Sequence, residues 1–373
     1  MAKIRVLYDG WPLVYAPNSP AALHLECLLA LHPMQMEAHL ALPGMQVGYL
    51  PEPVVRHSLP NNNSEAGKLR WEQISLPGLA KKIEARLIHL TSSMPSLRAA
   101  RASLISPTGE IEPSGLLIGM QPPQMSFAQR LRTSLGEGGL TGLGGRLWPD
   151  DLPDPQQSAG LIRLPAVVTP GFGQPAQTTP EMDDLALPDS YVLAQPGDEE
   201  SGLRRLLATW SWAAGGLGEN YPLLLAGLST AGKALLSRLL KEYKLENSAR
   251  ALPYVNRVNL AALYQNCSAF LHTGNLAAWG DPARLALASG RPLVGFENRW
   301  MDVMAGPAAY LVHGDGSSRE SCRLLGAALV TVVIEDSVAE SLSQAAYIRA
   351  QPWLKAGPQF TRKLGEIYEA HSA

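Results

Sequence analysis

A few polar side chains stand at positions where they could bind or act on a ligand. His89 ends a short apolar strand, ARLIHL, at the edge of a predicted parallel sheet, which is where α/β proteins place their sites. Arg204 and Arg205 lie in the first turns of a helix that follows another predicted strand. Asp281 and Pro282 begin a further helix, whose first amides could hold an anion.

The last of these residues belong to a clearly punctuated stretch, Leu252–Val294. It predicts a helix over Leu260–Cys267, a strand over Ala269–His272, an irregular loop, a second helix and another strand. Asp281 can cap the second helix, and the proline after it suits the first helical position. Gly290 follows the helix where a left-handed residue is favoured.

This stretch resembles the donor-binding segment of family 4 glycosyltransferases, which are retaining enzymes of the GT-B fold. The resemblance rests on the order LxxLYxxC, strand, loop, Trp279-Gly280-x-Pro282 and Ala286-Leu287-Ala288-Ser289-Gly290-x-Pro292-Leu293-Val294. It implies an α/β protein of two Rossmann-like domains with parallel sheets that face a cleft. It also implies a metal-independent reaction, no cofactor, and a nucleoside diphosphate sugar as donor.

The residues that carry this family's chemistry differ here. Ala277 and Leu285 stand where the family has two glutamates that hold the sugar and the nucleotide ribose. The stretch from Gln195 to Gly202 lacks the family's arginine and lysine and carries three carboxylates instead. Because like charges at close range repel by about 1 kcal/mol even at high effective dielectric, a diphosphate would be repelled there. Arg204 or Arg205 could substitute, or could belong to a solvated helix face.

Helix capping competes with ligand binding at two further positions. Asp281 would place its own carboxylate at the anion-binding end of its helix. After the first strand Gly10 is retained, but Asn18, Ser19 and Pro20 precede the next helix where the family has a glycine-rich turn. Their side chains would obstruct close approach of a ligand, so we expect them to cap the helix.

The resemblance nevertheless defines a set of candidate site residues. His89 is the catalytic candidate, with a packing role as the alternative, while His24 is expected to be a core histidine with its hydrogen bonds satisfied and His272 to be structural. The donor-pocket positions are Gly10, Gly197, Ser201, Arg204, Arg205, Thr273, Gly274, Ala277, Trp279, Gly280, Asp281 and Leu285. Four aromatic residues in exposed-looking contexts either line the cleft or pack in the core: Trp11, Tyr15, Trp148 and Trp300.

The composition excludes several other classes of protein. Of the 373 residues 46% are apolar and 17% charged, and the net charge of −2 offers no basic surface to nucleic acid. No apolar run approaches the roughly 20 residues of a membrane span, and no signal peptide precedes the first strand. Three widely spaced cysteines indicate reduced core thiols, with neither disulfides nor a metal site. We therefore expect a cytoplasmic protein.

The N-terminal domain is predicted to be residues 1–180, and its β-α-β opening is typical of a parallel sheet. Strands are expected over Lys3–Tyr8, Glu37–Leu42, Ala85–Leu90 and Leu164–Val168, with a helix after Ser19. Residues 43–70 are expected to be irregular, and residues 98–160 show no clear pattern.

The C-terminal domain is predicted to be residues 181–350, followed by a helix in residues 351–373. Further strands are expected over Tyr191–Ala194, Leu223–Gly227 and Ala308–Val312, helices over Gly202–Trp212 and Ser229–Tyr243, and a helix start at Ser337-x-x-Glu340. One face of the final helix carries Phe360, Leu364, Ile367 and Tyr368, and the resemblance packs this helix against the N-terminal domain.

Two functions from different classes remain open. The first is a glycosyltransferase-like protein with a degraded donor site, weakly or non-catalytic, which acts with a transferase partner or as an oligomer in glycan or glycolipid assembly. The second is an active retaining glycosyltransferase that uses Arg204 or Arg205 on the phosphates and His89 near the sugar. A GT-B epimerase or phosphorylase is a third possibility, but no residue in the sequence supports it.

Overall fold

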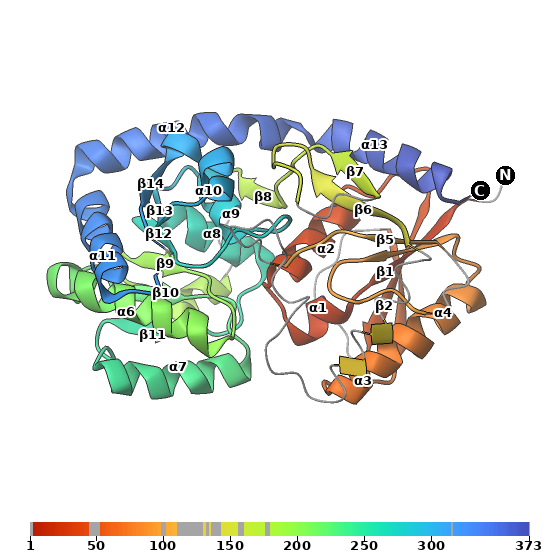
Figure 1. The fold of residues 1–373 in the computed structure, drawn as a ribbon, viewed down its shortest axis with the longest axis horizontal. Coiled ribbons are helices and arrows are strands. Elements are labelled where there is room, and N and C mark those ends of the chain that lie inside the picture. The colour runs from red at the N-terminus through yellow and green to blue at the C-terminus, as the bar shows by residue number, and fades with distance from the viewer. Residues whose placement is uncertain are drawn as a thin grey trace. The chain divides into compact units, whose positions relative to one another are not determined.

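The structure, a computed structural model, describes residues 3–44, 53–97, 102–109, 130–131, 134–135, 143–155, 160–175, 180–314 and 316–372 (Figure 1). The chain forms two compact units. Unit 1 comprises Met1–Val167, Ala277–Gly280 and Lys355–Ala373, and unit 2 comprises Val168–Leu276 and Asp281–Leu354.

Unit 1 is built on a parallel sheet of seven strands in the order β3-β2-β1-β4-β5-β6-β7. The strands are β1 (Arg5–Asp9), β2 (Glu37–Pro43), β3 (Val54–Leu59), β4 (Leu87–Leu90), β5 (Ala102–Ile105), β6 (Leu143–Pro149) and β7 (Leu161–Leu164). All residues of β4 are buried, as expected for a strand covered on both faces. The helices of this unit are α1 (Trp11–Tyr15), α2 (Pro20–Ala30), α3 (Glu65–Arg70), the π-helix η1 (Trp71–Ser75), α4 (Leu76–Lys82) and α13 (Gly357–Ala370).

Unit 2 contains a parallel sheet of six strands in the order β11-β10-β9-β12-β13-β14. These are β9 (Val192–Ala194), β10 (Leu223–Leu225), β11 (Ala249–Ala251), β12 (Ala269–His272), β13 (Leu293–Phe296) and β14 (Ala309–Val312). Its helices are α6 (Glu200–Leu217), α7 (Thr230–Tyr243), α8 (Arg257–Asn266), α9 (Pro282–Ala288), α10 (Arg299–Met304), α11 (Arg319–Ile334) and α12 (Asp336–Lys355). Short elements complete it: β8 (Pro170–Gly173) and the 3-10 turns η3 (Pro180–Leu185) and η4 (Gly306–Ala308).

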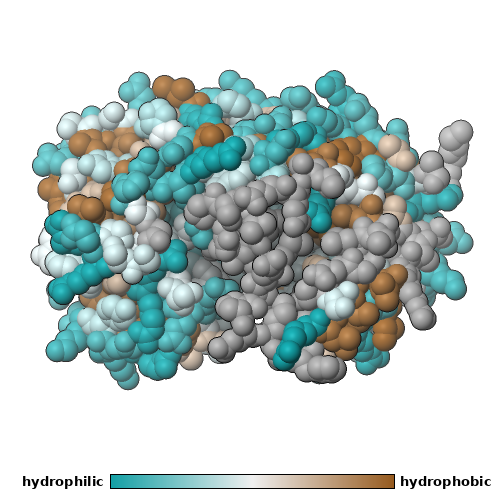
Figure 2. Space-filling view, in the orientation of Figure 1, coloured by the Kyte–Doolittle hydropathy of each residue, from teal (hydrophilic) through white to brown (hydrophobic). Residues whose placement is uncertain are grey.

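An apolar core of unit 2 lies between its sheet and the helices α6, α7 and α11. Leu206 and Trp210 of α6, Leu239 of α7 and Leu329 of α11 pack in one cluster with strand residues such as Leu225. On the face shown in Figure 2, hydrophilic residues cover most of the described surface and hydrophobic ones occur in scattered groups. Among the described helices, none is long and apolar enough to cross a membrane.

The expected fold class is confirmed, and so are several local predictions. Asp281 caps α9, the proline after it is the first helical residue, and Gly290 follows the helix with a φ of +67°. Ser19 caps α2. The predicted apolar face of the last helix is buried in α13, and Tyr368 hydrogen-bonds to Tyr8 of β1, so this helix packs on the N-terminal sheet.

Other predictions were wrong. Residues 43–70 are not irregular throughout, because β3 and α3 lie within them; residues 45–52 lie outside the described part. The strand predicted over Leu164–Val168 ends at Leu164, because Pro165 cannot donate a hydrogen bond to a neighbouring strand. Ser337 caps no helix, since α12 already begins at Asp336.

The sequence pattern also missed helices. The loop expected after β1 contains α1, and α11 precedes α12 with only one residue between them. Three of the four exposed-looking aromatics, Trp11, Trp148 and Trp300, are buried, so they pack in the core.

Candidate functional site

The start of α9 is occupied by a side chain of the protein itself. Asp281 is 1% exposed, and its Oδ1 accepts the backbone N–H of Ala283 at 2.7 Å and, less closely, that of Arg284 at 3.4 Å. Both N–H groups belong to the first turn of α9 and point out of its N-terminus, where a helix otherwise favours a bound phosphate. The carboxyl group of Asp281 therefore fills the position that an anion would take.

The two positions at which the sequence resemblance would place glutamates are apolar and closed. Leu285 lies in α9, in which every residue is buried, and it is 2% exposed. Ala277 is also 2% exposed. Neither side chain can accept a hydrogen bond from a sugar or ribose hydroxyl.

The loop Ala277–Gly280 belongs to unit 1 and is held there by Trp279. The indole N–H of this tryptophan donates to the carbonyl of Leu147 at 2.9 Å, and its ring stacks on His24 with centroids 4.7 Å apart. Gly280 has a φ of +67°, and a Cβ atom there would lie 2.0 Å from the carbonyl oxygen of Pro20. Trp279 is therefore a buried anchor, and Gly280 allows the close approach of the two chain segments.

His24 is buried as predicted, but it is not fully satisfied. Its Nε2 has no hydrogen-bond partner within the described part of the chain, and burial lowers its pKa well below the usual value. His272, at the end of β12, is also buried, and its Nε2 likewise has no hydrogen-bond partner within the described part of the chain. Beyond it Thr273 is buried and Gly274 half-buried.

The turn before α6 places a second carboxylate at a helix start. Asp198 accepts the backbone N–H of Ser229 at 3.0 Å, and Ser229 caps α7. A Cβ atom at Gly232 would lie 2.0 Å from Oδ1 of Asp198, so this glycine makes room for the carboxylate. Gly197 and Ser201 are exposed on either side.

Arg204 and Arg205 are adjacent in sequence but point to different partners. Arg204 donates to Glu242 at 2.6 Å and to Glu200 at 2.9 Å, and these bonds raise its pKa and lower those of both glutamates. Arg205 donates instead to the carbonyl of Thr273 at 3.1 Å, directly after β12. Arg204 is therefore committed to an ion-pair network on α6 and α7, whereas Arg205 reaches the carboxyl edge of the sheet.

The carboxyl edge of the first sheet holds a buried polar cluster that the sequence did not predict. Asp9 ends β1, and its Oδ2 accepts the hydroxyl of Ser93 at 2.5 Å, while its Oδ1 accepts the indole N–H of Trp71 at 2.8 Å. The ammonium of Lys68 donates to Ser93 at 2.7 Å and lies 4.4 Å from the ring centre of Trp11. These groups meet between β1 and β4, at the point where the strand order reverses and α/β proteins bind ligands. Here the protein's own charges fill that position.

Gly10 and the residues before α2 also have roles within the fold. A Cβ atom at Gly10 would lie 2.3 Å from the carbonyl oxygen of Ala41, to which the N–H of Gly10 donates at 2.8 Å. The hydroxyl of Ser19 accepts the N–H of Ala22 at 3.2 Å. The predicted capping role of Ser19 is confirmed, and Gly10 is required by the neighbouring strand β2.

His89 lies inside unit 1 and both of its ring nitrogens are engaged. Nδ1 is 2.6 Å from the hydroxyl of Tyr368, and Nε2 is 2.7 Å from the hydroxyl of Ser106. The chain of hydrogen bonds continues from Tyr368 to Tyr8 at 3.0 Å and from Tyr8 to His32 at 2.8 Å. Burial lowers the pKa of His89 to about 3, so the ring is neutral near pH 7.

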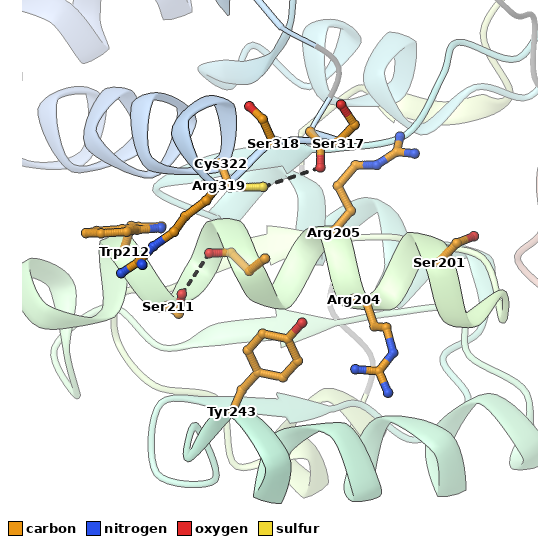
Figure 3. Close-up of a pocket in the computed structure, with 12 residues that line it drawn as sticks. Ser201, Arg204, Arg205, Ser211, Trp212, Tyr243, Ser317, Ser318, Arg319 and Cys322 are labelled. Atoms are coloured by element: carbon orange, nitrogen blue, oxygen red, sulfur yellow. Dashed lines mark hydrogen bonds between the residues drawn. The ribbon is translucent and has the colours of Figure 1, made fainter.

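An open groove of about 510 Å³ runs over unit 2 (Figure 3). It lies along the outer side of α6, between the end of α7 and the loop that leads into α11. Three of the candidate residues line it, namely Ser201, Arg204 and Arg205. In Figure 3 Arg204 points toward α7 and Arg205 toward Ser317 and Ser318.

No family model matches this chain, and no curated protein matches it either. Solved structures do. A sucrose-phosphate synthase from Thermosynechococcus elongatus has a TM-score of 0.67 at 12% identity, and each chain is covered to 99%. WaaG, a glycosyltransferase involved in lipopolysaccharide biosynthesis, has a TM-score of 0.69 at 12% identity, with 98% of this chain and 99% of WaaG covered. HepE from Anabaena, solved with UDP and glucose, has a TM-score of 0.65 at 14% identity, with 98% of this chain and all of HepE covered. With its two parallel α/β sheets, the chain therefore has the GT-B fold of these glycosyltransferases.

Proposed function

We propose that this chain is a glycosyltransferase-like protein, related to family 4, whose site for a nucleoside diphosphate sugar is degraded. It is weakly or non-catalytic, and it acts with a transferase partner or a second copy in glycan or glycolipid assembly. Residues 1–180 form its acceptor-side domain, 181–350 its donor-side domain and 351–373 the returning helix. A cytoplasmic location fits its composition.

The observation that carries this proposal is the carboxylate of Asp281 on the first amides of α9. A nucleotide diphosphate would have to displace a buried side chain that stabilises the helix by about 1 kcal/mol. A second carboxyl group, that of Asp198, accepts the backbone N–H of Ser229 at the start of α7.

Few side chains remain that could stabilise the charge of a leaving diphosphate. Much of the rate enhancement of such enzymes comes from preorganised charges and dipoles at the reacting atoms. Arg204 is neutralised by two glutamates, and Leu285 and Ala277 supply no polar atom. His89 is enclosed by its own hydrogen bonds in unit 1. The proposal follows from the joint loss of these groups.

One observation favours the alternative, an active retaining transferase with a rearranged site. Arg205 reaches the carbonyl of Thr273 at the carboxyl edge of the second sheet, and it pairs with no carboxylate among the described residues. It could therefore move onto a phosphate. HepE, which has a similar fold, was solved with UDP and glucose.

Turnover separates the two functions. We would incubate the protein with UDP-, GDP-, ADP- and dTDP-sugars, with and without mono- and disaccharide acceptors, and measure the release of nucleoside diphosphate. The degraded site predicts no release above that of a sample without protein. Release that Arg205→Ala abolishes, while Arg238→Ala leaves it intact, would establish the alternative.

A second variant tests the closed positions directly. The exchange Ala277→Glu with Leu285→Glu restores both carboxylates of the family pattern. Because Leu285 is 2% exposed, an unpaired charge there should lower the melting temperature of the protein. If the double variant melts like the original chain and begins to release nucleotide, the site is open and needs only its glutamates.

A further inference from the structure

Two arginines in the groove on unit 2, Arg205 and Arg319, pair with no carboxylate among the described residues. Glu200, Glu242 and Glu320, the carboxylates beside it, are each bound to an arginine other than Arg205 and Arg319. Arg205 donates to a carbonyl, and the guanidinium of Arg319 lies over an indole ring. Neither arginine has a carboxylate partner within the described part of the chain.

One of these cations is held in place by a glycine. Gly316, in the loop before α11, has a φ of +72°, and a Cβ atom there would lie 2.5 Å from Cδ of Arg205 and 2.6 Å from its Cγ. The stem of Arg205 therefore rests on the bare backbone of Gly316, and the hydrogen bond to Thr273 fixes its end. A side chain that is already ordered loses little conformational freedom when it binds a ligand.

The rest of the groove combines an indole ring with hydroxyl groups. Trp212 remains 39% exposed, with Arg319 at 5.4 Å from its ring centre (Figure 3). Ser201, Ser211 and Ser317 also line the groove. An exposed indole packs against the apolar face of a pyranose ring, hydroxyls exchange hydrogen bonds with sugar hydroxyls, and arginine binds carboxylate or sulfate through two parallel bonds.

We propose that this groove binds an anionic oligosaccharide, with Arg205 and Arg319 on its carboxylate or sulfate groups and Trp212 against a sugar ring. The choice of a glycan over an acidic peptide rests on the proposed function and on the lining of the groove, in which serines and arginines outnumber apolar side chains that could hold a peptide anchor. The groove would hold the growing product beside a transferase that does the chemistry. It does not require a donor site in this chain.

Calorimetric titration of the full chain tests this. The probes are a galacturonate tetrasaccharide and a sulfated tetrasaccharide, with maltotetraose as the neutral control and a tetraglutamate peptide as the competing class. Both anionic glycans should bind with a Kd below about 1 mM at low salt and weaken at high salt. Maltotetraose should bind far more weakly.

Variants locate the binding. Arg319→Ala and Trp212→Ala should each weaken binding of the anionic glycans about tenfold. Gly316→Ala, which displaces Arg205 without removing it, should weaken it too. Arg238→Ala is the matched control, because Arg238 is 61% exposed on α7 and does not line the groove, and it should leave the Kd unchanged.

Three results would overturn the proposal. Equal affinity for maltotetraose would show that charge plays no part in binding. The absence of a binding signal with both anionic glycans would exclude anionic oligosaccharides as ligands. Binding of tetraglutamate alone would make the groove a docking surface for an acidic protein segment. None of these outcomes depends on nucleotide release, so a failure here is distinguishable from a failure of the proposed function.

Discussion

The hydroxyl of Tyr368 joins the C-terminal helix to the first sheet, and its removal should weaken unit 1 specifically. It lies 2.6 Å from Nδ1 of His89 and 3.0 Å from the hydroxyl of Tyr8, and all three residues are fully buried. Tyr368→Phe keeps the ring and therefore the packing. Tyr8 retains its bond to His32, so the loss falls on the nitrogen of His89, which becomes unsatisfied inside the protein.

A buried polar group without its partner costs about 1–3 kcal/mol, and we take about 2 kcal/mol for this nitrogen. For a unit of this size the melting temperature should fall by about 4–8 °C. Because two units need not unfold together, a single melting curve is not sufficient. Hydrogen exchange followed by mass spectrometry reports each unit separately. Peptides from β1, β4 and α13 should exchange up to roughly 30-fold faster, and peptides from β9 and β12 should not change.

The matched control is Tyr347→Phe, which removes a hydroxyl from a residue that is 60% exposed and should shift stability by less than about 0.5 kcal/mol. A double variant with Tyr8→Phe should show a coupling of about 0.5–3 kcal/mol between the two hydroxyls. If Tyr368→Phe behaves like Tyr347→Phe, or if the protection of unit 2 falls as much as that of unit 1, the role assigned to this hydrogen-bond chain is refuted.

Three further outcomes are expected. Burial lowers the pKa of His89 to about 3 and that of His32 to about 4, so these histidines take up protons in the unfolded chain at a higher pH than in the folded protein. The free energy of unfolding should therefore fall between about pH 6.5 and pH 4, by up to about 1.4 kcal/mol per pH unit for each of the two histidines. Urea denaturation curves that coincide at pH 7 and pH 5 would contradict this. Asp281→Ala should cost about 1–2 kcal/mol in urea denaturation, with Asp281→Asn retaining most of the cap, and equal losses would show that the cap does not act through its acceptor oxygen. Gly280→Ala should destabilise the protein clearly more than Gly290→Ala, because both have a φ of +67° but only Gly280 meets another backbone; equal melting temperatures would contradict the steric argument.

Several predictions that depend on neighbours in sequence succeeded. The cap at Asp281, the proline after it and the glycine that ends α9 act within one helix, so their residue types alone predict the element. The strand over Ala269–His272 was predicted with its observed bounds, because a short apolar run between a helix end and a loop has few other solutions.

Other arrangements of residues distant in sequence were predicted wrongly or not predicted. Asp9, Lys68 and Ser93 meet only because β1, α3 and β4 end together, and the segment that holds Lys68 gave no helical pattern. Trp148 is surrounded in sequence by polar and proline residues, yet it is buried by contacts that the sequence does not display. The groove likewise combines α6 with the start of α11, a helix that the pattern missed.

The central claim is that no nucleoside diphosphate binds where the GT-B relatives would hold one. Isothermal titration of the full chain with UDP, GDP, ADP and dTDP tests it most directly. The account predicts no saturable heat up to millimolar ligand. A Kd in the micromolar range, equivalent to about 8 kcal/mol, that Asp281→Asn tightens and Arg205→Ala weakens would contradict it and establish a working donor site.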